Sequence, residues 1–489
     1  MRQLKILFLY PNYAYVGIGA PVGVASIAAA IKEKGFDFDF FDTSFILKVP
    51  KLNDFYSAFK AHATADDIVP QSLDVVVEQF KNEFDLSSYD IVLVSTLTRT
   101  HNIGLQLIKA VKEVNPSAYV IVGGLHPVVA PEETIRDEGI DCICIGEGDE
   151  GIVELLQRIA KDLSFKDVQG FWFNDNGTIT RNQDRFENNL DAMPLPDYSF
   201  FRKEHFATAF DGKIYNTLPV EISRGCLYKC SFCHHSRNGG VGTYRKYSVR
   251  VAIDKLKKLK EMYDVEFFRF VDESLSFMSK DYFRELSELY AKEVGVPFVV
   301  MTNAHTLDDE TAGMLKKMNC VAISMGVEHG NEDFRINMLD KKLKDKHVYN
   351  AFSLLKKHGI RATAYFLVGL PHETREMAFA SIRMNKRLVE EFDAAPSGVP
   401  CFHPYPGTKL TKICHEENLL ADNISEDYAC LRPALDMPQF SYDEINGIYR
   451  TFFAYSVMPE KYWPLVELCE KESKASDKML QTIMNIHTK

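Results

Sequence analysis

Short apolar runs alternate with helix-like segments over the first 160 residues, and this alternation limits the possible folds most strongly. Runs rich in Ile, Val and Leu occupy residues 5–10, 91–95, 119–122 and 142–145. Each leads through a loop into amphipathic sequence, such as GVASIAAAIKEKG, which ends at Gly35 as a predicted C-cap. This order predicts an open parallel sheet whose ligands bind beyond the carboxyl ends of the strands. Residues 1–190 are therefore predicted to form a Rossmann-like, doubly wound α/β domain.

Small residues follow the predicted strands of this first domain. They are Gly17, Gly19, Gly23, Ser95, Thr96, Gly123, Gly124, Gly146 and Gly148, with Glu147 between the last two. Glycine lets the backbone approach a large flat ligand, and several glycines at one sheet edge are better evidence than a single turn. No G-x-G-x-x-G opens the first helix, so a dinucleotide is the poorer interpretation.

A second series of alternating strand-like and helix-like segments follows in the second half of the chain. Predicted strands occupy residues 218–222, 267–271, 298–301, 321–325, 363–368 and 398–402. Six strand–helix units are too few to close an ordinary eight-stranded barrel. A Pro-rich stretch opens a predicted linker over residues 191–214, after a hairpin at residues 170–181. Residues 421–489 are predicted to be helical. Their aromatic side chains are interpreted as core packing in preference to the wall of a binding site.

Three cysteines, Cys226, Cys230 and Cys233, occur at the spacing C-x3-C-x2-C after the first of these strands. Three thiolates can hold three irons of a cubane and leave the fourth iron open for chemistry. Zinc would need a fourth ligand, and His234 and His235 stand so close to Cys233 that they would crowd one side of a tetrahedron. Disulfides would need an oxidising compartment. The spacing therefore favours an open iron–sulfur cluster.

The cysteine motif is preceded by Arg-Gly and has Phe232 before its last cysteine, and in this it resembles the radical S-adenosylmethionine (SAM) superfamily. The resemblance implies that the three cysteines bind a 4Fe-4S cluster whose open iron chelates the amino and carboxylate groups of SAM. One electron would then cleave SAM and release a 5′-deoxyadenosyl radical. The resemblance also implies an open (β/α)6 partial TIM barrel over residues 215–420.

Polar residues and glycines follow the barrel strands, where parallel barrels place their active sites. By resemblance, Asp272 and Glu273 hold the methionyl amino group of SAM, Glu328 binds the ribose, and Gly369 lies beside the adenine. Asn303 follows another of these strands and is expected at the same cofactor site. Solvated acids at loop starts are the alternative interpretation of the carboxylates.

A second resemblance covers most of residues 1–160. The runs VIVGGLHPVVAPEE and EGIDCICIGEGDEGIVELL resemble the cobalamin-binding domain that precedes many radical SAM domains. The D-x-H-x-x-G motif is absent, which implies a corrinoid without a lower histidine ligand and with its nucleotide tail along Gly123 and Gly124. His101 and His126 follow the third and fourth strands and are predicted to be loop residues. A degenerate sheet that has lost its ligand is the alternative.

These resemblances imply a cobalamin-dependent methyltransferase acting on an unactivated carbon through a 5′-deoxyadenosyl radical and methylcobalamin. Cyclisation or rearrangement without methyl transfer uses the same cofactors and stays open. Methylthiotransferases of the superfamily carry three further cysteines in the N-terminal domain, whereas only Cys142 and Cys144 occur here, at positions expected in the core. A non-catalytic cobalamin or iron–sulfur sensor is disfavoured by the three-cysteine set and by the lack of a recognisable output domain.

Four histidines follow successive barrel strands: His305, His329, His372 and His403. Histidine donates hydrogen bonds and exchanges protons near neutral pH. His329 and His372 are predicted to contact the substrate, with solvated loop histidines as the alternative. Few Arg or Lys residues stand at these strand ends, so a carboxylated or aromatic small molecule is a better candidate substrate than a polyphosphate.

Composition narrows the partners and the compartment. The net charge is −11 with Lys and Arg scattered, which argues against nucleic acid as a partner. No run approaches the roughly 18 apolar residues that span a bilayer. The ten cysteines lack a disulfide framework spacing. We therefore expect a cytoplasmic protein that works without oxygen and takes electrons from a donor such as flavodoxin or ferredoxin. Residues 42–88 are expected to insert polar, helix-like sequence near the sheet edge or the mouth of the cofactor site.

Overall fold

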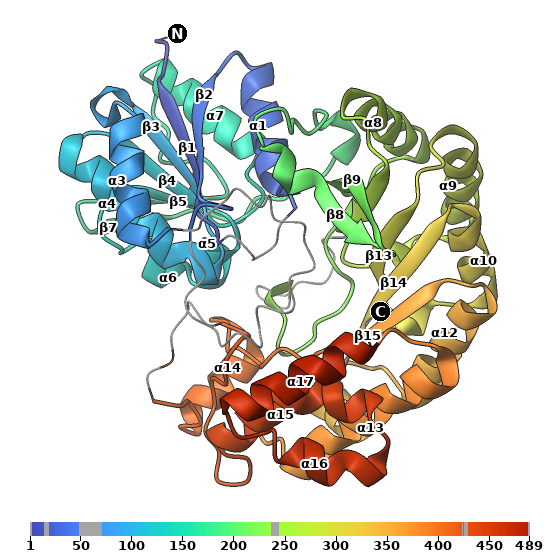
Figure 1. Cartoon of the computed structure of the whole chain (residues 1–489). Helices are drawn as coiled ribbons and strands as arrows, with labels where there is room; N and C mark the ends of the chain where they lie inside the picture. Colours follow the sequence, from blue (N-terminus) through green and yellow to red (C-terminus); the bar gives the residue numbers. More distant parts are fainter. Residues whose placement is uncertain are drawn as a thin grey trace. The chain divides into compact units, whose positions relative to one another are not determined.

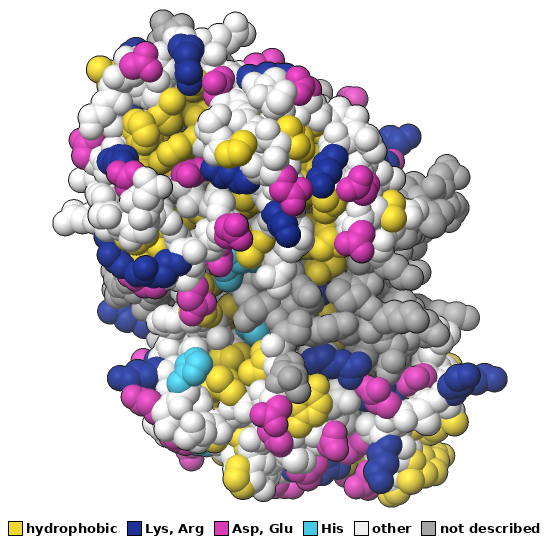
Figure 2. Space-filling model, turned by 90° about the vertical axis from the view of Figure 1, so that its left-hand side faces the viewer, with side chains coloured by type: hydrophobic (Ala, Val, Ile, Leu, Met, Phe, Trp, Pro, Cys, Tyr) yellow, Lys and Arg dark blue, Asp and Glu magenta, His cyan; other side chains and the backbone are white. Residues whose placement is uncertain are grey.

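The computed structural model describes residues 2–13, 19–47, 71–235, 244–422, 424 and 429–487. Gly17 and the polar segment at 51–67, which belongs to the expected insertion, lie outside the described residues. The described chain divides into two compact units, one up to residue 219 and one from residue 220. Among the described residues, no helix has the length and apolar character needed to cross a membrane. Lys and Arg side chains are interspersed with Asp and Glu on the face drawn in Figure 2.

The first unit contains a seven-stranded sheet in the order β2-β1-β3-β4-β5-β6-β7. Its strands are β1 (Ile6–Tyr10), β2 (Phe38–Asp42), β3 (Ile91–Ser95), β4 (Tyr119–Gly123), β5 (Cys142–Cys144), β6 (Phe171–Asp175) and β7 (Thr178–Arg181). The first five are parallel, and β6 and β7 are antiparallel. The predicted parallel sheet and the hairpin are both confirmed. Asn176 and Gly177 join β6 to β7 with positive φ values, which favour such a tight hairpin turn.

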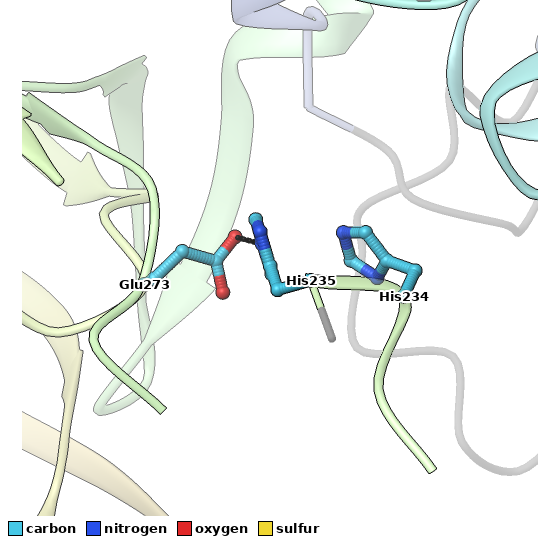
Figure 3. Close-up of side chains that lie close together, drawn as sticks. All are labelled: His234, His235 and Glu273. Carbon is cyan, nitrogen blue, oxygen red and sulfur yellow. Dashed lines mark ion pairs between the residues drawn. The ribbon is translucent and has the colours of Figure 1, made fainter. Parts of the chain in front are cut away.

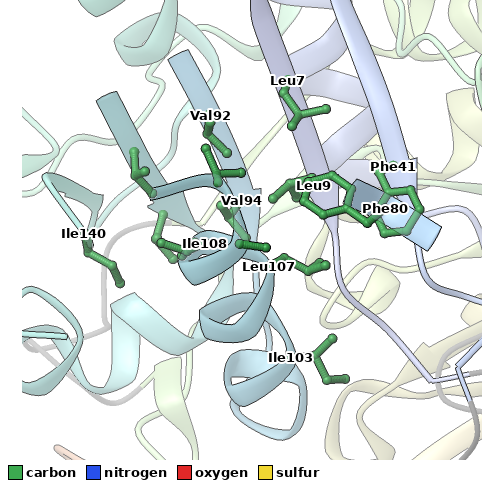
Figure 4. Close-up of a cluster of buried hydrophobic side chains, with 14 of the residues drawn as sticks. Leu7, Leu9, Phe41, Phe80, Val92, Val94, Ile103, Leu107, Ile108 and Ile140 are labelled. Carbon is green, nitrogen blue, oxygen red and sulfur yellow. The ribbon is translucent and has the colours of Figure 1, made fainter. Parts of the chain in front are cut away.

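Helices cover both faces of this sheet (Figure 1). They are α1 (Val22–Glu33), α3 (Leu73–Glu83), α4 (His101–Val114), α5 (Leu125–Val129), α6 (Pro131–Thr134) and α7 (Asp149–Ala160). Side chains from α3 and α4 pack on one face of the strands, where Phe80, Leu107 and Val94 are almost fully buried (Figure 4). Helical and strand periodicities meet in this core, which explains why the alternating sequence predicts the layers correctly.

The second sheet is curved and has the order β15-β14-β13-β12-β9-β8. The strands are β8 (Ala207–Phe210), β9 (Lys213–Val220), β12 (Phe267–Phe270), β13 (Phe298–Thr302), β14 (Cys320–Glu328) and β15 (Arg361–Phe366). Strands β12 to β15 belong to the second unit, whereas β8 and all of β9 but its last residue precede residue 220. Strands β12 to β15 are parallel, and β8 is antiparallel to β9. The predicted sixth strand at 398–402 forms one isolated parallel bridge, between Val368 and Cys401. The open partial barrel is confirmed.

Helices lie on the convex side of the curved sheet, as Figure 1 shows for α8, α9, α10 and α12. The helices of the second unit are α8 (Val249–Met262), α9 (Lys280–Glu293), α10 (Asp309–Lys317), α11 (Glu332–Asn337), α12 (Asp345–Lys357), α13 (Arg375–Phe392), α14 (Lys409–Glu416), α15 (Tyr442–Val457), α16 (Trp463–Glu467) and α17 (Lys474–His487). Phe452 and Tyr455 of α15 are buried, which confirms the core interpretation for these aromatics, whereas Tyr462 is exposed.

Candidate functional site

The three cysteines lie in the loop that follows the short strand β10 (Ser223–Arg224), which pairs with β11 (Arg245–Lys246). All three thiols are free and partly buried. Two ligands of one zinc ion lie at most about 4.6 Å apart, because each Zn–S bond is about 2.3 Å. The cysteines do not belong to any group of three metal-ligating atoms within 4.8 Å of one another in the described part of the chain. The described side chains are therefore not arranged as a preformed zinc site.

Ser231 anchors this loop to the segment that follows α11. Its backbone N–H donates to Leu339 O at 2.9 Å, and its hydroxyl donates to Met338 O at 2.6 Å. The N–H of Leu410, in α14, donates to Ser231 O at 3.1 Å. The middle of the cysteine loop is thus fixed by three hydrogen bonds to distant parts of the second unit.

Lys341 lies at the end of the segment that holds Ser231, and it forms an ion pair with Glu328. Lys341 Nζ and Glu328 Oε1 are 3.0 Å apart, and both side chains are largely buried. Glu328 has a φ of 72°, and its carboxylate folds back over Gly326, where an added Cβ would lie 2.1 Å from Oε1. This predicted ribose ligand is therefore held in a strained backbone conformation by its surroundings.

The same lysine acts on the cysteines electrostatically. Burial raises the pKa of Cys230 to about 11, while the Lys341 ammonium opposes that rise. Burial also raises the pKa of Cys233 to about 12. Iron binds thiolates, so loading the site would release these protons. A buried cation beside three prospective thiolates fits a cluster that carries net negative charge.

Asp272 is buried and joins the end of β12 to the strand that leads into the cysteine loop. Its carboxylate accepts the Ile222 N–H at 3.2 Å and the Ser223 hydroxyl. Burial, reinforced by the negative charge of Glu221, raises the pKa of Asp272 to about 7. These contacts direct its oxygens toward the backbone of the neighbouring strand.

Glu273 points the other way and pairs with His235, at 2.7 Å between Oε1 and Nε2 (Figure 3). His234 lies next to His235, and the three ligand atoms lie within 4.8 Å of one another. Burial raises the pKa of Glu273, but the hydrogen bond to His235 and the charges of His235 and His234 together leave it below its usual value. A carboxylate that stays ionised is suited to hold an ammonium group such as that of SAM.

His329 and His372 occupy different environments, and the structure does not bring them together. His329 is fully buried; its Nδ1 accepts the Asn331 N–H at 3.0 Å, so Nε2 carries the proton and faces Glu373 Oε1 at 3.2 Å. His372 is 45% exposed and pairs with Glu417 at 2.6 Å. One predicted substrate histidine is thus an interior residue and the other a surface residue.

Glu373 also positions the turn at Gly369. Its Oε2 accepts the N–H groups of Gly369 at 2.7 Å and Leu370 at 3.0 Å. Gly369 has a φ of 77°, and an added Cβ would lie 2.8 Å from the side chain of Ile445 in α15. Asn303 caps the turn after β13, where its side-chain oxygen accepts the His305 N–H at 2.9 Å. Both residues lie at strand ends, as predicted.

The carboxyl edge of the first sheet contains the glycines expected to contact cobalamin. Two of them must be glycine because a side chain there would clash with the backbone of the same unit. An added Cβ on Gly124, which has a φ of 91°, would lie 2.4 Å from Thr96 O. One on Gly146 would lie 2.5 Å from Arg185 O. At Gly123 the nearest atom would be Cys144 Cβ at 3.7 Å, which is an ordinary contact. Gly123 therefore leaves open backbone at the edge.

The remaining predicted residues complete this edge. Ser95 is partly buried and pairs in register with Gly123, and Thr96 is buried. Glu147 Oε2 accepts the Glu187 N–H at 2.8 Å, so this carboxylate holds a crossing segment of its own unit. Gly148 would place a Cβ 3.4 Å from Cys144 Sγ, a contact the edge can accommodate. Small, partly exposed residues at adjacent strand ends fit a flat corrinoid.

His101 and His126 correct one expectation, because both are buried helix residues and not loop residues. Their rings stack with centroids 3.9 Å apart. His101 Nε2 lies 2.8 Å from Asp137 Oδ2, and His126 Nδ1 lies 3.4 Å from Thr98 Oγ1. Packing between α4 and α5 accounts for their burial.

Comparison with known proteins decides the family. The radical SAM superfamily model matches residues 220–384, and the B12 binding domain model matches residues 14–156. The chain is a cobalamin-binding radical SAM enzyme. These two domains imply a 4Fe-4S cluster, SAM and cobalamin as its cofactors. The cysteine loop, the glycine edge and the Glu273 and Glu328 carboxylates lie within the matched ranges.

Three relatives illustrate the similarity. An uncharacterised methyltransferase, PH0819 of Pyrococcus horikoshii, is 24% identical over 94% of each chain. The anaerobic magnesium-protoporphyrin IX monomethyl ester cyclase of Cereibacter sphaeroides is 25% identical over 94% of this radical SAM chain and 72% of its own. The structure of the radical SAM methyltransferase TsrM from Kitasatospora setae, with tryptophan substrate and aza-SAM, has a TM-score of 0.65 at 15% identity, covering 97% and 88% of the two chains. That structure shares the fold.

Sequence reasoning missed two residues of this site, Lys341 and His235 in its role beside Glu273. It also passed over Arg269 within β12. Lys341 lies 13 residues after Glu328, in a turn without a motif. Arg269 interrupts the apolar run FFRF, which was a visible signal, because a charged residue is unusual in a strand of a buried parallel sheet.

Proposed function

We propose that the protein is a cobalamin-dependent radical SAM methyltransferase that acts on an unactivated carbon of a small molecule. One observation carries the proposal: a single chain combines a C-x3-C-x2-C loop, in a region that matches the radical SAM superfamily, with a region that matches the B12 binding domain. A relative named as a methyltransferase matches 94% of both chains, which supports methyl transfer.

When bound, the cluster and SAM supply a carbon-centred radical, and cobalamin supplies the methyl group. The protein holds and orients these groups. Cys226, Cys230 and Cys233 would hold three irons, while Lys341 offsets the charge of their thiolates. The chemistry of the residues fits these tasks.

The carboxylates at the barrel edge would orient SAM. Glu273, kept ionised by His235, would accept hydrogen bonds from the methionyl ammonium. Glu328, fixed by Lys341, would accept them from the ribose hydroxyls. The Gly369 turn, whose N–H groups are satisfied by Glu373, would present its backbone beside the adenine. Each polar contact is preorganised by a partner within the second unit.

The finer assignments extend the same proposal. Residues 1–190 would bind cobalamin, residues 191–214 would link the domains, residues 215–420 would form the radical SAM barrel, and residues 421–489 would cover it. His329 and His372 would contact the substrate, His329 from the protein interior. The substrate would be carboxylated or aromatic, electrons would come from a flavodoxin or ferredoxin, and the enzyme would work in the cytoplasm without oxygen.

A second function has one observation in its favour. The Cereibacter sphaeroides relative is named as a cyclase and matches 94% of this chain. Cyclisation or rearrangement of a substrate radical would use the same cysteine loop and the same carboxylates.

The test uses protein reconstituted anaerobically with iron, sulfide and cobalamin. Incubation with a reductant and SAM should yield 5′-deoxyadenosine, and a cell extract supplied with methyl-labelled SAM should yield a labelled small molecule. A product that forms without label would favour the cyclase alternative. The absence of 5′-deoxyadenosine from cluster-loaded protein would contradict both functions.

A further inference from the structure

Arg269 lies on the concave face of the curved sheet. Its neighbours Phe268 and Phe270 are almost fully buried, and Phe270 packs against Tyr290 of α9 on the convex side. Side chains alternate between the faces of a strand, so Arg269 projects to the opposite, concave side. It pairs in register with Val299 of β13.

The concave face near Arg269 is open and mostly apolar. Val271, Met301 and Tyr365 are 42%, 46% and 41% exposed, although they belong to or directly follow the central strands. Met301 pairs with Ser324, and Tyr365 pairs with Gly326 on the neighbouring strands. Exposed large side chains at the centre of a sheet mark a surface that is shaped for a ligand.

The guanidinium of Arg269 has no partner in the described chain. It forms no hydrogen bond or ion pair there, although its side chain is partly buried. Burial lowers its pKa, and the nearby Tyr365 opposes that change. Buried cations are normally paired, and an arginine offers five N–H donors in a planar fork that matches a carboxylate.

Two hydroxyl groups lie on the same concave face, on β14 and β15. Ser324 Oγ lies 3.5 Å from Tyr365 Oη, and both side chains come from strands adjacent to each other in the sheet. The guanidinium balances the single negative charge of a carboxylate, and the two hydroxyl groups can donate hydrogen bonds to its oxygens. A phosphate group carries up to two charges at neutral pH and would need further cations.

We propose that Arg269, Tyr365 and Ser324 form a binding site for the carboxylate of the substrate, whose apolar body contacts Val271 and Met301. This site deepens the proposed function and rests on it, because it names the substrate class. It adjoins the residues assigned to SAM. Val271 directly precedes Asp272. Tyr365 pairs with Gly326, over which the Glu328 carboxylate folds. The site would orient the substrate by its acidic end and leave its apolar carbons near the strand ends.

The experiment measures binding of benzoate to cofactor-loaded protein by calorimetry, with benzamide and phenylphosphonate as matched probes. Wild-type protein should bind benzoate at least tenfold more tightly than benzamide. Arg269→Gln should abolish that preference, and Tyr365→Phe should reduce it severalfold. Arg383→Gln, which changes an exposed arginine paired with Glu376, should leave it unchanged.

Labelling of arginines with phenylglyoxal keeps the proposal testable if Arg269→Gln fails to fold. In the wild-type protein, Arg269 should react and benzoate should protect it. Equal affinity for benzoate and benzamide, tighter binding of phenylphosphonate, no benzoate binding, or loss of SAM binding in Arg269→Gln would each overturn the proposal. Formation of 5′-deoxyadenosine is measured separately, so failure of the proposed function is distinguishable from failure of this site.

Discussion

The two predicted cofactor edges are built in different ways. The edge of the first sheet consists of glycines and small polar residues, and its geometry depends on backbone packing, as at Gly124 against Thr96. The edge of the barrel consists of charged side chains that are held in pairs, such as Glu328 with Lys341 and Glu273 with His235. The first edge is suited to recognise a large flat cofactor by shape, and the second to recognise small polar groups by charge.

The largest effect expected from this contrast is at the cysteine loop. Cys230→Ala should remove most bound iron and all SAM cleavage, because a second iron of the cubane loses its ligand. Cobalamin binding should persist, because Cys230 belongs to the second unit and the predicted cobalamin site belongs to the first. Iron analysis and the corrinoid absorbance report the two sites separately. Cys469→Ala, a buried cysteine of the C-terminal region, is the matched control. Full SAM cleavage by Cys230→Ala protein would remove the cluster assignment.

At the first edge, adjacent glycines should separate folding from binding. Gly124→Ala places a side chain on a residue with a positive φ and within 2.4 Å of Thr96 O. The free energy of unfolding should therefore fall by about 1–3 kcal/mol. Gly123→Ala meets only an ordinary contact and should fold normally, while weakening cobalamin binding. Chemical denaturation and cobalamin titration distinguish the two. If Gly123→Ala binds cobalamin as well as the wild type, the open backbone at this position is not a cofactor contact.

The two histidines at the barrel edge should differ in stability. His329→Ala leaves the buried Glu373 carboxylate without one partner and should destabilise the fold by about 1–3 kcal/mol. His372→Ala changes an exposed ion pair and should stay within about 0.5 kcal/mol. Denaturation curves test this order, and substrate turnover then tests the proposed role of each. Equal stability loss in both variants would contradict the burial argument.

The last prediction concerns pH. Asp272 keeps its proton in the folded state up to a pKa of about 7, whereas an unfolded aspartate loses it near pH 4. The folded chain therefore binds more protons between these values, and the contribution of Asp272 to the free energy of unfolding falls as pH rises from about 4 to about 7. Asp272→Asn should lack this contribution. Denaturation of both proteins at pH 5 and pH 8 measures the difference, and an identical pH dependence would show that Asp272 does not titrate as stated.

Much of this architecture could be predicted from the sequence. Alternating apolar runs gave the right strands because a buried parallel strand and an amphipathic helix carry different periodicities. The sixth barrel strand was wrong, since residues 398–402 form one bridge only. The ion pairs and hydrogen bonds of the site could not be predicted, because Lys341, His235 and Glu373 meet their partners only through tertiary packing. Helix packing also buried His101, His126 and His329, which local sequence placed in loops.

The most direct test of the central claim follows the methyl group of SAM. Protein loaded with cluster and cobalamin is reduced anaerobically with SAM that carries a deuterated methyl group, and the corrinoid is analysed by mass spectrometry. We expect a labelled methyl group on the corrinoid of the wild-type protein. A corrinoid that stays unlabelled while 5′-deoxyadenosine accumulates would contradict methyl transfer and leave a radical enzyme of the cyclising kind.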